Sequence, residues 1–590
     1  MTRLFAFFLV VPVLAFSQQL QTDAARIKHH LKRLNFLGSV LYVAAHPDDE
    51  NTRVIASLAN DRLAATAYLS MTRGDGGQNL IGPEIRDQLG LIRTQELIAA
   101  RKIDGGQQFF TRANDFGFSK SATETFAIWG KDDVLSDVVR VYRQYQPDVI
   151  LTRFPPDERA GHGHHTASAM LAIEAFDISG KPSAHPDLLR AMPVWQPKRL
   201  LINTGRWWNT TINENTPGIV TLNVGGYNTL LGESYSETAA TSRSQHKSQG
   251  FGVPSQRGDA LEFFELTRGD AAKDIFDGVN TTWTRVKGGE TVKPLVEKAI
   301  REYDLERPYA SIPLLLQIRE AIRKVEPGVW RERKLNETEQ LIKDCLGLYT
   351  EVAAGYYYAA PGQPVTLKLE VINRSPVDVM LTRIASANFQ FDSTMNSRLS
   401  FNVPLMHSIK KQLHPAKAFS DPYWLKEPHS TGLFTVNDAS QIGRPENEPA
   451  MIITLELMIG KEKLVVQTPV TYKWTDPVKG ELYRPVEVVP PAFLNVSEPV
   501  MIFADQSPRK LQVLVKSTVE GNLSGDLMLQ VPDGWRYEPP TLPVSLSRRG
   551  GEVTRTFTIY PSSVEATGTV KAMISVGGKT YDYAVQTIDY

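Results

Sequence analysis

Cysteine is nearly absent from this sequence, since the 590 residues contain one, Cys345. A single thiol cannot form an internal disulfide or build a cysteine-rich zinc site, so both kinds of scaffold are excluded. A charge excess is also missing, because 65 Lys and Arg residues balance 65 Asp and Glu residues. A protein that binds nucleic acid through its electrostatic field would carry a surplus of basic groups. We therefore expect no nucleic-acid partner.

Apolar runs long enough to cross a membrane are missing as well. The run Leu4–Phe16 holds 13 residues, whereas a spanning helix needs about 20. It follows Arg3 and ends with small residues at the positions that a signal peptidase reads, which predicts a cleaved secretory signal over residues 1–17. Export without disulfides is typical of a bacterial periplasmic or secreted protein. We expect that location and a mature chain without a transmembrane segment.

The pattern over residues 18–287 alternates short apolar strands with helices. Continuous apolar strands that alternate with helices indicate a parallel sheet covered on both faces. We therefore expect a Rossmann-like α/β domain. The strands that carry this prediction are 39–45, 64–70, 148–152, 199–203 and 218–223, and the helices between them include 90–102 and 132–145.

The rest of the chain predicts three further parts. Apolar residues at helical spacing indicate a helical connector over residues 288–354. Beyond it, runs with a period of two residues, such as 365–371 and 554–560, alternate with prolines and glycines, as in β-sandwich modules. The length suits two immunoglobulin-like β-sandwiches, 355–478 and 484–590.

The first predicted strand leads directly into His46-Pro47-Asp48-Asp49-Glu50. Ligands of an open parallel sheet bind beyond the carboxyl ends of its strands. This motif places one imidazole and three carboxyl groups within five residues at the end of a strand. Such a concentration of charge is unfavourable unless a cation binds these groups. Histidine and aspartate suit Zn²⁺, with Fe²⁺ or another divalent ion as the alternative.

A second cluster, His162-Gly163-His164-His165, follows the strand at 148–152. Because parallel strands end at the same edge of a sheet, the two clusters should converge on one crevice. Three protein ligands and a water molecule form the usual catalytic zinc site. The residues alone thus predict metal-assisted hydrolysis.

Together these clusters resemble the PIG-L/LmbE family of metal-dependent de-N-acetylases. Residues 45–50 match the A-H-P-D-D-E motif of that family, and the resemblance extends over roughly residues 36–180. It implies that His46, Asp49 and His165 bind the metal. It also implies that Asp48 is the general base, and that His162, which with His165 matches the family's H-x-x-H motif, stabilises the oxyanion in its cationic form or acts as an acid.

Further residues are candidate substrate contacts. Two come from a loop beside the first motif, two match the R-x-x-E and D-x-G motifs of the family, and two belong to a polar, glycine-bearing loop at 242–252. Both loops could instead be solvated connections. The six candidates are Arg73, Asp75, Arg93, Asp115, Arg243 and His246.

The function that we expect is an exported zinc-dependent hydrolase that removes N-acetyl groups from an acetamido sugar or glycoconjugate. One alternative is a metal-dependent amidase that acts on a non-sugar amide. Another is a glycan-binding or adhesion protein with a degenerate catalytic domain. Pro532-Asp533-Gly534-Trp535, with Gly568, resembles the NEW3-type immunoglobulin-like domain attached to many bacterial carbohydrate-active enzymes. No sequence feature indicates an oligomeric state.

Overall fold

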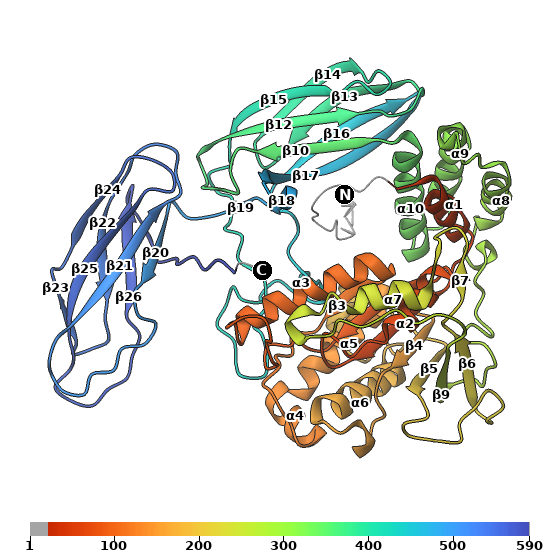
Figure 1. The fold of residues 1–590 in the computed structure, drawn as a ribbon, viewed down its shortest axis with the longest axis horizontal. Coiled ribbons are helices and arrows are strands. Elements are labelled where there is room, and N and C mark those ends of the chain that lie inside the picture. Colours follow the sequence, from red (N-terminus) through yellow and green to blue (C-terminus); the bar gives the residue numbers. More distant parts are fainter. Residues whose placement is uncertain (1–21, 589–590) are drawn as a thin grey trace, which may run out of the picture. The chain divides into compact units, whose positions relative to one another are not determined.

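The computed structural model describes residues 22–588, which form two compact units (Figure 1). The α/β unit comprises residues 22–347 together with Asp421–Asn447, and the β unit comprises Leu348–Ser420 and residues 448–588. The predicted signal peptide, residues 1–17, lies outside the described residues. Within the described part of the chain, no helix is both long and apolar enough to cross a membrane.

The α/β unit is built on a seven-stranded sheet with the order β3-β2-β1-β4-β5-β9-β6. The first five strands in this order pair in parallel, which confirms the predicted parallel sheet. β9 and β6 extend one edge in antiparallel pairing. The strands are β1 (Ser39–Ala44), β2 (Ala65–Ser70), β3 (Gln107–Phe110), β4 (Val149–Thr152), β5 (Arg199–Thr204), β6 (Ile219–Asn223) and β9 (Leu261–Gly269). Two short strands, β7 (Tyr227–Asn228) and β8 (Glu233–Ser234), pair apart from this sheet.

Helices cover both faces of this sheet because successive strand residues point to opposite sides. Leu41 and Val43 of β1 belong to a core that includes residues of α5 and α6, whereas Val40 and Tyr42 belong to a second core with residues of α2 and α3. The strand is therefore apolar throughout, as the sequence pattern predicts. The helices are α1 (Ala24–Arg33), α2 (Thr52–Asn60), α3 (Asp87–Asp104), α4 (Ala122–Trp129), α5 (Lys131–Tyr145), α6 (Gly163–Ile178) and α7 (Tyr235–Arg243).

The predicted connector contains α8 (Lys293–Glu302), α9 (Ile312–Arg323) and α10 (Val329–Leu346), and these helices belong to the α/β unit. The ammonium of Lys334 on α10 donates to the carbonyl oxygen of Arg33 at the end of α1, at 2.8 Å. Gly347 ends α10 in the left-handed conformation that glycine adopts without steric cost.

The β unit contains one eight-stranded sheet and two four-stranded sheets, plus a two-stranded pairing of β11 with β19. The two four-stranded sheets, β20-β21-β25-β23 and β24-β22-β26-β27, share a single apolar core. Their immunoglobulin-like topology stays a prediction. The strands are β10 (Tyr349–Ala354), β11 (Tyr358–Ala359), β12 (Pro364–Ile372), β13 (Val379–Ser386), β14 (Phe391–Arg398), β15 (Leu405–Gln412), β16 (Ile452–Ile459), β17 (Glu462–Asp476), β18 (Gly480–Pro485), β19 (Glu487–Val488), β20 (Ala492–Val496), β21 (Arg509–Ser517), β22 (Leu523–Gln530), β23 (Arg536–Glu538), β24 (Leu542–Leu546), β25 (Glu552–Tyr560), β26 (Lys571–Val576) and β27 (Lys579–Tyr581).

A segment between β15 and β16, which we call the 421–447 arm, packs on the α/β unit although it lies in the sequence of the predicted 355–478 module. The amide of Phe434 donates to the carbonyl oxygen of Arg112 at 2.8 Å, and the amide of Asn114 donates to that of Gly432 at 2.9 Å. The arm thus provides backbone partners for the segment that follows the edge strand β3.

Candidate metal centre and active site

The first motif turns sharply at the carboxyl end of β1. Asp48 has a φ of 113°, which is unusual for a residue with a side chain. Its amide donates to Glu50 Oε2 at 2.9 Å, and Asn51 begins α2 by accepting a hydrogen bond from the amide of Val54. Backbone strain of this kind persists where the surroundings hold it, and it clusters at functional sites.

His46, Asp49 and His165 come together as the resemblance implies. His46 Nδ1 lies 3.1 Å from Asp49 Oδ2, and His165 Nε2 lies 3.6 Å from Asp49 Oδ1. One donor atom from each residue lies within 4.8 Å of the others. His165 Nδ1 lies 3.1 Å from the carbonyl oxygen of Ala160, which can accept its proton and leave the Nε2 lone pair free for a metal.

The charges around His46, Asp49 and His165 favour a positive charge at this site. Burial opposes charging of His46, but Asp49 and Asp115 outweigh it and raise the pKa of His46 to about 9. Burial also opposes ionisation of Asp49, yet His165 and His46 hold the pKa of that carboxyl well below its usual range. The three donors are therefore a chemically suitable set for a divalent cation.

His164 is completely buried between the two motifs. Its Nδ1 lies 3.0 Å from His46 Nε2 and 3.7 Å from Asp115 Oδ1, and its ring packs against Trp129 and Phe116. Among residues 22–588, its Nε2 has no hydrogen-bond partner. His46, His162 and His164 form a second group whose donor atoms lie within 4.8 Å of one another. The sequence pattern predicts that His164, which alternates with the two proposed histidines, either supports the metal ligands or faces solvent. The structure buries it against His46, so it does not face solvent.

His162 lies in an environment that keeps it neutral. Burial and the nearby His46 lower its pKa to about 4. The amide of His164 points at its Nδ1 and the amide of Ser119 at its Nε2, both at 3.2 Å. A neutral imidazole can accept at one nitrogen only and donates from the other. His162 is therefore neutral in this environment, whereas the sequence led us to expect a cationic donor.

Asp48 has the environment of a general base. Burial and the charge of Asp49 raise its pKa to about 7, near the value at which a base works best at neutral pH. Arg243 at the end of α7 donates to the carbonyl oxygen of Asp48 and lies over the ring of Phe251. Two residues far apart in the sequence thus meet at the strained turn.

Glu50 is the centre of a buried ionic network. Its Oε1 lies 2.8 Å from His246 Nε2 and accepts from Arg101 Nη2 at 3.2 Å. Arg101 also pairs with Asp104, which accepts a hydrogen bond from Ser242. Burial opposes ionisation of Glu50, but His246 and Arg101 lower its pKa to about 2. The network fixes the end of the motif against α3 and the loop after α7.

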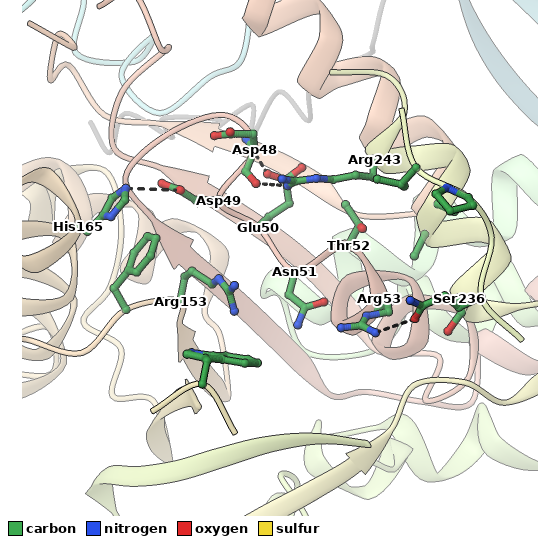
Figure 2. A pocket seen from close by; sticks show the side chains of 17 residues that line it. Asp48, Asp49, Glu50, Asn51, Thr52, Arg53, Arg153, His165, Ser236 and Arg243 are labelled. Carbon is green, nitrogen blue, oxygen red and sulfur yellow. Dashed lines mark hydrogen bonds and ion pairs between the residues drawn. The ribbon is translucent and has the colours of Figure 1, made fainter. Parts of the chain in front are cut away.

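A cavity of about 570 Å³ opens on Asp48, Asp49 and His165 (Figure 2). Among the six predicted substrate contacts, Arg243 lines it. The other five do not line it: His246 pairs with Glu50, Arg73 contacts the 421–447 arm, Arg93 donates to the carbonyl oxygen of Gln78, Asp115 faces His46, and Asp75 is buried.

The cavity is also lined by Arg53, Arg153 and Trp207, which were not among the six predicted contacts. Arg153 directly follows β4, so the rule that ligands bind at the carboxyl ends of strands could have identified it.

Comparison with known proteins places the two clusters in a recognised family. Residues 41–176 match the PIG-L family, described as GlcNAc-PI de-N-acetylase. A 1D-myo-inositol 2-acetamido-2-deoxy-alpha-D-glucopyranoside deacetylase of Streptomyces scabiei is 28% identical over 167 residues, which are 25% of this chain and 51% of that protein. A mycothiol S-conjugate amidase of Streptomyces coelicolor is 26% identical over 182 residues, 28% of this chain and 60% of that protein.

Among solved structures, an N,N'-diacetylchitobiose deacetylase from Pyrococcus horikoshii matches with 18% identity and a TM-score of 0.27, covering 37% of this chain and 71% of that one. The chain spans about half the length of the curated relatives it matches.

Proposed function

We propose that this chain, whose residues 41–176 form a PIG-L family domain, is an exported zinc-dependent hydrolase that removes N-acetyl groups from an acetamido sugar or glycoconjugate. Fe²⁺ is the alternative metal. The observation that carries the proposal is the set of His46, Asp49 and His165 beside the half-buried carboxyl of Asp48. Asp48, Asp49 and His165 line the cavity of the α/β unit. Export rests on the predicted signal at residues 1–17, and the periplasm or the medium is the proposed location.

The chemistry follows from the positions of these side chains. A divalent ion held by His46, Asp49 and His165 would lower the pKa of a bound water and polarise the amide carbonyl. Asp48 accepts the proton of the attacking water, for which its raised pKa suits it. The same carboxyl then delivers the proton to the leaving nitrogen, and the products are acetate and a free amine.

His162 would act on the oxygen of the amide carbonyl. As a neutral imidazole it holds one N–H, and this donor would stabilise negative charge on the oxygen in the transition state after the backbone amide that faces the same nitrogen, of His164 or Ser119, has moved away. This role does not require the cationic form that its lowered pKa disfavours.

Two other functions compete with this proposal. The relative named as a mycothiol S-conjugate amidase supports an amidase that uses the same residues as the second candidate. That its amide lies outside a sugar is our own alternative and has no support from this relative. A glycan-binding protein with a degenerate domain would need neither a metal nor a base, whereas all five residues of the proposed machinery are present: His46, Asp48, Asp49, His162 and His165.

The test is to measure zinc content and acetate release from N-acetylglucosamine oligomers with the purified chain. We expect Asp48→Asn to retain zinc and to lose about 10²–10⁴-fold in kcat, the usual contribution of a general base. His165→Ala is expected to lose stoichiometric zinc. Asp526→Asn, at an exposed position of β22, is the matched control. Unchanged acetate release by Asp48→Asn, or full zinc content in His165→Ala, would contradict the assignment.

A further inference from the structure

Three arginines line the cavity that opens on Asp48 and Asp49, and they differ in their partners (Figure 2). Arg53 pairs with Glu262 at 2.8 Å and donates to Gln256 at 3.2 Å. Arg243 donates to the carbonyl oxygen of Asp48. Arg153 forms no ion pair with any carboxylate of residues 22–588. Its side chain hydrogen-bonds to the hydroxyl of Tyr42, and its guanidinium lies 5.3 Å from the ring centre of Trp207.

Arg153 is held on a rigid part of the sheet. Its amide donates to the carbonyl oxygen of Val43 at 3.0 Å, which continues the pairing of β4 with β1 by one residue. The next residue, Phe154, stacks on the ring of His165 with 3.8 Å between the centroids. The guanidinium is therefore placed beside the metal-binding set by backbone and ring contacts, as a preorganised binding group should be.

Among residues 22–588, none of the three carboxylates that line the cavity, Asp48, Asp49 and Glu50, forms an ion pair with Arg153. Glu50 is already compensated by Arg101 and His246. Asp49 faces His46 and His165, where it would balance a bound divalent cation. A partly buried guanidinium beside a cation centre is unfavourable when the cavity is empty, and it strongly favours an anion as ligand.

We propose that the substrate is an N-acetylated sugar that also carries an anionic group, a carboxylate or a phosphate, which Arg153 binds. Trp207, which is 55% exposed and lines the same cavity, supplies a flat apolar face for the sugar ring. Guanidinium groups match both anions because they form paired, charge-assisted hydrogen bonds. This inference rests on the proposed function and specifies its substrate class.

The first measurement is binding without turnover. In the Asp48→Asn background, calorimetry compares N-acetylglucosamine with N-acetylglucosamine 6-phosphate and N-acetylmuramic acid. We expect at least one anionic sugar to bind about 10–100-fold more tightly than the neutral one, the equivalent of a charged hydrogen bond of about 1.5–3 kcal/mol. The tighter of the two identifies phosphate or carboxylate. Equal binding of all three sugars would overturn the inference.

The second measurement is acetate release by Arg153→Gln in the otherwise unchanged, zinc-loaded chain. We expect KM for the anionic sugar to rise about 10–100-fold more than KM for the neutral sugar. Arg153→Lys, which keeps the charge, should recover part of the loss. Arg159→Gln, at an exposed site paired with Asp157 outside the cavity, is the control.

The two proposals fail in different ways. If neutral and anionic sugars release acetate equally well, or if Arg153→Gln slows both alike, the anion inference is wrong while the deacetylase proposal holds. If the chain binds an anionic sugar through Arg153 but no sugar releases acetate, the deacetylase proposal fails and the anion site stands.

Discussion

Asp75 carries a buried carboxyl group that is 3% exposed. In the described part of the chain, residues 22–588, neither of its side-chain oxygens is hydrogen-bonded to another residue. Helix α3 packs directly on it, because a Cβ added at Gly90 would lie 1.9 Å from Asp75 Oδ1. Burial and the neighbouring Asp115 raise the pKa of Asp75 to about 7. Between pH 3.8 and about 7, the carboxyl of Asp75 therefore keeps its proton in the folded chain and loses it in the unfolded chain.

This proton predicts a pH dependence of stability. Between the ordinary pKa of 3.8 and about 7, the folded state binds more protons than the unfolded state, so the free energy of unfolding falls as the pH rises. Asp75→Asn keeps the shape and removes the titration. We expect the stability of this variant relative to the original chain to rise by up to about 4 kcal/mol between pH 4 and pH 8. Urea unfolding at several pH values measures it.

The matched control for this prediction is Asp526→Asn, whose exposed position in β22 should leave the pH dependence of unfolding as it is in the original chain. A constant stability difference between Asp75→Asn and the original chain across this pH range would show that the carboxyl of Asp75 is ionised in the folded state.

Single residues also show what the sequence could predict of the site. The metal-binding set was predictable because each motif concentrates its ligands within a few positions after a strand. The pairing of Glu50 with His246 was not, since the two residues lie 196 positions apart and meet only in the folded chain. The same holds for Arg243 and the carbonyl oxygen of Asp48.

Among the structural elements, the 421–447 arm has the clearest effect on a buried group of the α/β unit. Trp424 lies over the guanidinium of Arg73, 3.5 Å from the centre of its ring, and Phe110 contacts the same group. The nitrogens of Arg73 donate to the carbonyl oxygens of Arg444 and Pro445. The arm thus provides most of the hydrogen-bond partners of this buried charge, and Thr94 of α3 accepts one further hydrogen bond from it.

We expect Trp424→Ala to destabilise the α/β unit by about 3–5 kcal/mol, because the 4% exposed ring leaves a cavity next to a buried guanidinium. Chemical unfolding followed by circular dichroism gives the value. Phe401→Ala removes a ring that is 62% exposed, and such a surface change should stay within about 0.5 kcal/mol. Similar unfolding midpoints for the two variants would mean that the arm does not stabilise the unit.

The elements that sequence reasoning found and those that it missed differ in a physical property. β1, β2 and β4 are buried on both faces and read as continuous apolar runs. β3 has a polar first half, Gln107-Gln108, and lies at the edge of the sheet, so its pattern carries little signal. The arm has no helix or strand of its own, and its place depends entirely on tertiary contacts.

For the whole molecule, the 421–447 arm means that the two structural units are not two continuous stretches of sequence. A boundary after Gly347 separates the α/β region from the β region along the chain, yet Asp421–Asn447 belongs to the α/β unit. The last two sheets share a core of their own. The α/β unit should therefore depend on part of the C-terminal half and not on all of it.

Two truncations test this dependence. A chain that ends at Gly347 lacks the arm. This truncation removes the two carbonyl oxygens that accept from the guanidinium of Arg73, and it exposes the backbone groups at Arg112 and Asn114 that the arm satisfies. Each buried polar group left unpaired costs about 1–3 kcal/mol, so we expect this chain to unfold at lower urea and to lose acetate release. A chain that ends at Pro490 keeps the arm and the strands that flank it, and it should retain both. If the shorter chain matched the full chain in unfolding midpoint and activity, the arm would be dispensable.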